Sequence, residues 1–209
     1  MNAGTRAELA YEEVKRLVLS GAIAPGQRLD PVKLGAELSA GVTPVREALL
    51  RLAGERVVEM RKNTGFHLPV MTEVMLMDLY RWNFEVLRLA VASPTWKYSD
   101  DDTRRIPANA ANDAASLFAA IAQKSARPEI TAQIASANDR LMVARSAEAQ
   151  VLGDRRSEIK TIISATQHPR STLTGELRKY HSRRLSNARK LVTSIYKISD
   201  RSDNTSENL

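Results

Sequence analysis

The sequence predicts a mainly α-helical protein, with an N-terminal winged helix-turn-helix followed by an all-helical bundle. Three observations lead to this fold class. Three helical patterns lie within residues 5–55, a short β-hairpin pattern follows at 57–70, and only helical patterns recur after residue 72. We therefore expect a first domain over residues 1–71, a helical domain over 72–200 and a polar tail over 201–209.

The first helix is expected over residues 5–20. Thr5 and Glu8 have the spacing of a capping box. Apolar side chains then recur at helical spacing, at Leu9, Val14, Leu17 and Val18. Gly21 ends the pattern, and the segment 23–30 that follows is typical of a Pro-Gly turn.

The second and third helices are expected to be joined by a tight turn. Asp30 and Pro31 suit the N-cap and first position of a short helix that ends near Leu38. Thr43 can cap the next helix, with Pro44 at the first position, where its missing N–H costs nothing. The buried face follows, from Ala48, Leu49, Leu52 and Ala53. This spacing is typical of a helix-turn-helix.

A change of periodicity after this helix predicts the hairpin. Val57 and Val58 favour β-structure, and residues 62–65, KNTG, favour a turn. Beyond the turn, apolar and other side chains alternate over Phe66, His67, Leu68, Pro69 and Val70. A hairpin after a helix-turn-helix indicates a winged helix.

The rest of the chain predicts helices. A long one begins near Thr72 and includes the segment EVMLMDLYRWNFEVLRLAVA. A loop follows at 93–108, and its Asp100–Asp102 run favours a solvated loop over a cation site, since a Gly turn and a distal Glu are missing. Further helices are expected at 110–124, 128–152, 155–166 and 172–197.

Composition limits the classes of function. The 209 residues carry a net charge of +7 and include no cysteine, which excludes disulfide scaffolds and thiolate nucleophiles. The basic balance favours a polyanionic partner, while the 5% aromatic content argues against single-strand binding by base stacking. No charged-then-apolar leader and no membrane-length apolar run is present, so we expect a cytoplasmic protein without a membrane partner.

The opening turn of the third helix suggests contact with DNA. In a helix-turn-helix, the first turn of the second helix enters the major groove. There Thr43 offers a hydroxyl, and Arg46 offers a guanidinium that can donate two hydrogen bonds to guanine or to phosphate. Pro44 fixes the backbone geometry with which the helix would enter the groove. By itself this stretch fits an ordinary capped surface helix equally well. The helix before it and the hairpin after it favour DNA.

Residues 34–49, LGAELSAGVTPVREAL, closely resemble the GntR family of bacterial transcription regulators, whose typical motif is L-A-E-E-L-G-V-S-R-T-P-V-R-E-A-L. The order of domains resembles the FadR branch, in which an effector-binding helical domain called FCD follows the winged helix. The resemblance implies a cytoplasmic homodimer that binds a near-palindromic double-stranded DNA operator, as a repressor, with a small organic effector as an open question.

The resemblance also implies which residues contact DNA. Thr43 and Arg46 match contacting positions of the family, whereas Gly41 and Val42 stand where the family usually has Ser and Arg. Lys33, beside the start of the second helix, is expected to meet a phosphate. The expected DNA-binding set is Lys33, Val42, Thr43, Pro44, Arg46, Arg61, Lys62, Asn63, Thr64, Gly65 and His67.

The FCD domain usually holds a divalent metal through one Asp and three His. In the matching register those positions are Ala114, Phe118, Ile159 and His181, so we expect no metal and no cofactor. Asn83 and Leu87 replace the family's usual Arg and Glu. An effector pocket would be lined by Asn83, Phe118, Ile159 and His181. Either it is open and mainly apolar, or these side chains fill it and the domain only dimerises.

These features bear on three classes of function. A dimeric transcription regulator ranks first, and a constitutive or architectural DNA-binding protein is the alternative. An enzyme is not expected, because the three histidines are scattered and neither a phosphate loop nor a paired-carboxylate motif occurs: His67, His168 and His181. The operator, the effector and the sign of regulation do not follow from the residues.

Overall fold

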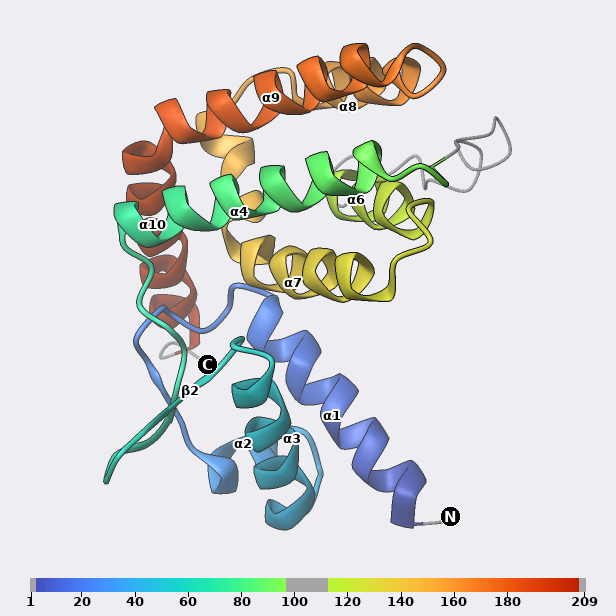
Figure 1. Ribbon diagram of the computed structural model, residues 1–209. Helices are drawn as coiled ribbons and strands as arrows, with labels where there is room; N and C mark the ends of the chain where they lie inside the picture. Colours follow the sequence, from blue (N-terminus) through green and yellow to red (C-terminus); the bar gives the residue numbers. More distant parts are fainter. Residues whose placement is uncertain (1–2, 97–112, 207–209) are drawn as a thin grey trace. The chain divides into compact units, whose positions relative to one another are not determined.

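The computed structural model describes residues 3–96 and 113–206. The chain forms two compact units, one of Met1–Thr72 with Thr193–Leu209 and the other of Glu73–Val192. Helices dominate, and the strands form one small three-stranded sheet (Figure 1). The predicted fold class is therefore confirmed.

The first unit contains the winged helix-turn-helix. Its elements are α1 (Ala3–Leu19), β1 (Arg28–Leu29), α2 (Pro31–Glu37), α3 (Val42–Gly54), β2 (Glu59–Arg61) and β3 (Gly65–His67). Helix α3 packs against both α1 and α2. Apolar side chains from all three helices and the sheet form one core, which includes Val14, Val18, Leu34, Leu49, Leu52 and Phe66.

The helix starts of this unit agree only in part with the prediction. Asp30 is the N-cap of α2, because its Oδ1 accepts a hydrogen bond of 2.8 Å from Val32 N, as expected. The capping box at Thr5 is wrong, since α1 already begins at Ala3. Thr43 is not an N-cap either, because α3 begins at Val42 after an extended Gly41. Pro44 still lies in the first turn, where N–H groups have no helical acceptor, so its place there is tolerated.

The sheet has an unexpected third strand. β3 is central and pairs antiparallel with β1 on one side and β2 on the other. Because β1 has only two residues, it shows no alternation of apolar and polar side chains, and it lies where the sequence indicated only a turn. Val57 and Val58, expected in the hairpin, precede β2 and are buried, and their N–H groups both donate to Leu52 O at the end of α3.

The second unit is all-helical in its described part. It contains α4 (Glu73–Ala92), α6 (Asp113–Gln123), α7 (Pro128–Val151), α8 (Arg155–Ala165) and α9 (Arg170–Ser186), close to the predicted bounds. α4 packs against α6, α7 and α9 (Figure 1). The core includes Val86, Leu117, Phe118, Ile134, Leu173 and Leu177. Residues 97–108 of the expected loop, with Asp100–Asp102, lie outside the described residues.

The single helix predicted at 172–197 is wrong. The chain breaks at Asn187 (φ −114°, ψ 12°), whose Nδ2 donates 2.8 Å to Arg183 O and so satisfies a carbonyl at the end of α9. A new helix, α10 (Ala188–Ser206), begins in the second unit and ends in the first. Residues 201–206, expected in a polar tail, are therefore helical. Within the described residues, no helix combines the length and apolarity needed to cross a membrane.

Candidate nucleic-acid interface and buried polar cluster

Helix α3 exposes three side chains at its start and buries one apolar face along its length. Val42, Thr43 and Arg46 are exposed, and Pro44 is half-buried. The buried side chains are Val45, Ala48, Leu49 and Leu52. Because Val45 and the later apolar side chains supply the packing, Thr43 and Arg46 lie outside the core and present a hydroxyl and a guanidinium at the start of the helix.

The wing presents a second exposed set. Its turn places Asn63 at φ 65° and Gly65 at φ 85°, and Thr64 N donates to Arg61 O at 3.3 Å. Lys62, Asn63 and Thr64 are exposed. Arg61, in contrast, donates from Nη2 and Nε to Glu59 Oε2 at 2.9 and 3.1 Å, so its charge is compensated within the hairpin. Lys62 is therefore the wing cation best suited to a phosphate.

Two further residues of the expected DNA-binding set, Lys33 and His67, differ in their exposure to solvent. Lys33 is exposed on the first turn of α2. His67 is buried, with Nδ1 3.2 Å from Gly65 O, because it lies on the central strand between Arg28 and Glu59. We therefore remove His67 from the set.

The four residues expected to line an effector pocket are all buried in the second unit. Asn83, Phe118, Ile159 and His181 are each 5% exposed or less. His181 lies at the centre of three of them: its Nε2 is 2.9 Å from Asn83 Oδ1, and its ring stacks on Phe118 at 5.6 Å between centroids. The Tyr180 ring lies edge-on to both Phe118 and His181. Side chains thus pack closely around Phe118 in this core.

The histidine at this position is neutral. Burial lowers the pKa of His181 to about 3, opposed by the hydrogen bond to Leu177 O and reinforced by nearby Arg184 and Arg145. The Leu177 carbonyl, 2.6 Å away, requires the single proton to be on Nδ1. Nε2 is then an acceptor, so the Asn83 amide should face it with Nδ2. The hydrogen-bonding pattern thus assigns the Nδ2 end of the Asn83 amide to the side that faces His181 Nε2.

This protonation state predicts a pH-dependent stability. The unfolded chain binds a proton at His181 below about pH 6.5 and the folded chain does not, so stability present above that pH is lost on acidification. Between pH 7 and about pH 5 the loss should be about 2 kcal/mol. Urea unfolding at both pH values measures it, with His181→Gln as the comparison. Equal pH dependence in the two chains would contradict a neutral buried His181.

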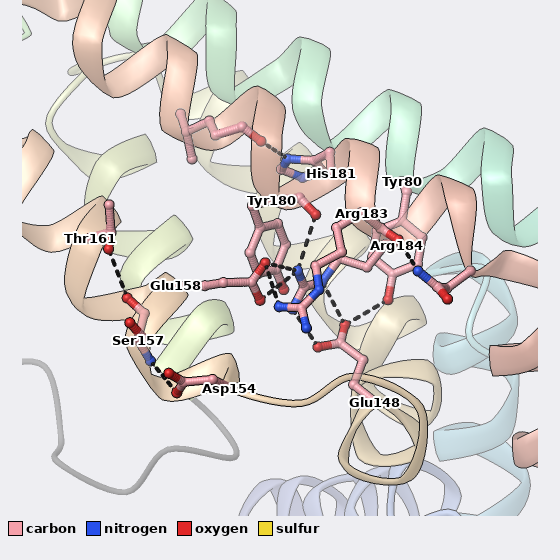
Figure 2. Close-up of polar contacts among 12 residues, drawn as sticks. Tyr80, Glu148, Asp154, Ser157, Glu158, Thr161, Tyr180, His181, Arg183 and Arg184 are labelled. Carbon is pink, nitrogen blue, oxygen red and sulfur yellow. Dashed lines mark hydrogen bonds and ion pairs between the residues drawn. The ribbon is translucent and has the colours of Figure 1, made fainter.

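A buried ion-pair network next to this core was missed at the sequence level. Arg184, 1% exposed at its side chain, donates from Nη2 and Nε to the two oxygens of Glu148 at 2.8 and 3.2 Å (Figure 2). Its Nη1 donates to Glu158 and to Tyr180 O. Tyr80 donates to Glu148 at 2.8 Å. Arg184 therefore joins α7, α8 and α9.

The network keeps Arg184 charged. Burial alone would lower the pKa of Arg184, but Tyr180, Glu148 and Glu158 raise it above the ordinary value. No sequence signal pointed to this network, because the basic run at 178–190 has the appearance of a solvated helix face.

The described residues contain no group of three or more His, Cys, Asp or Glu side chains close enough to hold a metal ion. Ala114, Phe118 and Ile159 stand in the apolar core instead. They offer no lone pair that could bind a cation.

Comparisons with known proteins link the first unit to a family. Residues 6–68 match the model of bacterial regulatory proteins of the gntR family. The chain is 34% identical over 80 residues to the HTH-type transcriptional regulator McbR of Escherichia coli (strain K12), covering 38% of this chain and 36% of McbR. It is 43% identical over 56 residues to the Nta operon transcriptional regulator of Aminobacter aminovorans, covering 27% of each. The match thus spans about a third or less of these relatives.

Two solved structures share the fold over most of the chain. The structure of E. coli McbR/YncC has a TM-score of 0.70 at 19% identity and covers 91% of this chain and 99% of that one. A GntR regulator structure from Rhodococcus sp. RHA1 has a TM-score of 0.71 at 17% identity, covering 88% and 97%. At this identity the likeness concerns architecture alone.

Proposed function

We propose that the chain is a sequence-specific, DNA-binding transcription regulator of the GntR family and of its FadR branch, with an FCD-type helical domain. The observation that carries the proposal is the start of α3, where Thr43 and Arg46 are exposed while the apolar face of the same helix packs into a winged helix-turn-helix. The gntR match over residues 6–68 covers this region. We propose residues 1–71 as the DNA-binding domain and 72–200 as the helical domain.

The proposed interface has two kinds of contact. Arg46, with Thr43, Val42 and Pro44, would face base edges in the major groove. Lys33 and Lys62, with Asn63, Thr64 and Gly65 in the wing, would meet phosphate or sugar. Arg61 would contribute less, because Glu59 already holds its guanidinium.

Two substitutions test whether Arg46 contacts a base and Lys62 contacts a phosphate. Arg46→Ala should weaken operator binding by about 1–3 kcal/mol and relax selectivity at one base pair, whereas Lys62→Ala should weaken all sequences equally and lower the salt slope by about one unit. Affinity is measured across single-base operator variants at several salt concentrations. Arg16→Ala, which removes an exposed arginine from α1, is the matched control. Equal losses for Arg46→Ala at every variant would reassign Arg46 to a phosphate.

We also propose a homodimer formed through the helical domain, which would suit a near-palindromic operator. Helix α4 supports it: Met75, Trp82 and Leu89 recur every seven residues and are 45%, 45% and 44% exposed. Such a stripe would be covered in a helix-mediated dimer. Equilibrium sedimentation of the chain should give a dimer, and Trp82→Glu should shift it towards monomer. A wild-type monomer at tens of micromolar, our practical threshold, would contradict the proposal.

A second candidate is a constitutive or architectural DNA-binding protein, in which the helical domain only dimerises. The close packing around Phe118 favours it, since Phe118 and Asn83 are 0% exposed. Release of a defined operator by a small molecule would exclude it. For the transcription regulator, repression in the cytoplasm is the form of regulation that we propose.

A further inference from the structure

Val42 is an exposed apolar side chain at the first position of α3. It is 46% exposed and does not belong to the core of the first unit, whereas Val45, three residues along the helix, is 0% exposed. Single exposed apolar residues are common on protein surfaces and by themselves indicate nothing. Val42 differs in its position, because it begins the helix whose first residues would face base edges in the proposed complex.

Three side chains form one exposed line along α3. Val42, Arg46 and Leu50 follow one another at intervals of four residues, and all three are exposed. Side chains at this spacing are neighbours on a helix surface, so Val42 lies next to Arg46, about 6 Å from it along the helix axis. Leu50, also 46% exposed, lies about 12 Å from Val42 along the axis, away from the end of the helix that would enter the groove.

The direction of the Val42 side chain is restricted. Valine branches at Cβ and occupies largely one rotamer in a helix, so its two methyl groups point in a defined direction. Gly41, the N-cap before it, is extended, with φ −68° and ψ 152°. Because Gly41 has no side chain, it places no group between the Val42 methyls and a base.

The isopropyl group of Val42 favours one base over the others. It has no hydrogen-bond donor or acceptor, so it would leave guanine N7 and O6, adenine N7 and N6 or cytosine N4 without the partner that water supplies. Thymine is the base that presents an apolar group in the major groove, its C5 methyl. Contact between this methyl and Val42 removes apolar surface of both partners from water, which is favourable.

We propose that Val42 is a specificity-determining residue, which selects thymine by its C5 methyl group within about two base-pair steps of the pair that Arg46 contacts. The distance follows from the separation of about 6 Å between the two residues and the spacing of about 3.4 Å between base pairs. The inference rests on the proposed function, because it assigns a base to a side chain of the proposed recognition helix.

Replacement of single methyl groups in DNA tests this contact. The probe is the duplex that the full chain enriches from a random double-stranded DNA library, and each of its thymines is replaced in turn by deoxyuridine, which lacks only the C5 methyl. One replacement near the pair whose base preference Arg46→Ala relaxes should weaken wild-type binding about three- to tenfold. Val42→Ala should weaken binding of the unmodified duplex to a similar extent and should be nearly insensitive to that replacement.

Three further variants make the assignment specific to Val42. Leu50→Ala is the matched control, because Leu50 has the same exposed fraction on the same helix, and it should keep the wild-type response to deoxyuridine. Thr43→Ser removes the other methyl group exposed at the start of α3 while keeping the hydroxyl, and should also keep that response. Val42→Arg supplies a guanidinium at this position and should move the base preference from thymine to guanine.

The outcomes distinguish this inference from the proposed function. If the chain enriches no duplex, sequence-specific binding fails and the role of Val42 fails with it. If the enriched duplex contains no thymine that responds to deoxyuridine, or if Val42→Ala responds as strongly as the wild-type chain, the role of Val42 alone is overturned. A response that Thr43→Ser abolishes and Val42→Ala retains would assign the contact to Thr43 instead. A thymine preference that persists in Val42→Arg also overturns the proposal.

Discussion

Arg184→Met is expected to lower the free energy of unfolding by about 3–5 kcal/mol, because it leaves the Glu148 carboxylate buried without its cation. Glu148 is 3% exposed, and Tyr80 would be its remaining partner of the three contacts it now receives. A carboxylate in that position must stay charged at a high desolvation cost or take up a proton. Both alternatives destabilise the second unit, where α7, α8 and α9 meet.

Chemical denaturation of the full chain measures this loss. Arg183→Met is the matched control, since Arg183 pairs with Glu158 while its side chain is 36% exposed, and it should cost about 0–1 kcal/mol. The double substitution Arg184→Met with Glu148→Met removes both charges and should recover much of the loss. A single Arg184→Met variant as stable as Arg183→Met would mean that the buried pair contributes little.

Elements that depend on local sequence patterns are predictable from the sequence, whereas elements that depend on contacts between distant residues are not. Helix α4 was anticipated over the segment it occupies, 73–92, because twenty residues of apolar periodicity need no tertiary information. β1 was missed since two residues show no alternation, and it exists only through pairing with β3. The break at Asn187 was missed as well, because apolar residues continue at helical spacing on both sides of it.

The predicted functional residues divide in the same way, into those set by a local motif and those whose surroundings depend on tertiary contacts. The exposed turn at Thr43 and Arg46 follows from a local motif, although the cap was placed two residues late. His67 was misjudged because only the sheet topology shows that β3 has neighbours on both sides. The Arg184 network depends on which helices meet, so the basic run around Arg184 carried no signal of burial.

Phe118→Ala is the second large effect, with an expected loss of about 3–5 kcal/mol in the free energy of unfolding. Phe118 is 0% exposed and contacts the rings of Tyr180 and His181, at 5.1 and 5.6 Å between centroids. Removing the ring from such packing leaves a cavity that its neighbours fill only in part. It also removes the apolar surface on which the Arg145 guanidinium lies.

The size of this loss decides between the two descriptions of the helical domain. In a filled core the full loss appears in urea unfolding, and Ile159→Val, as a smaller deletion in the same core, should cost about 0.5–1.5 kcal/mol. At the wall of an open pocket, Phe118→Ala would cost about as little as Ile159→Val and mainly change the response to ligand.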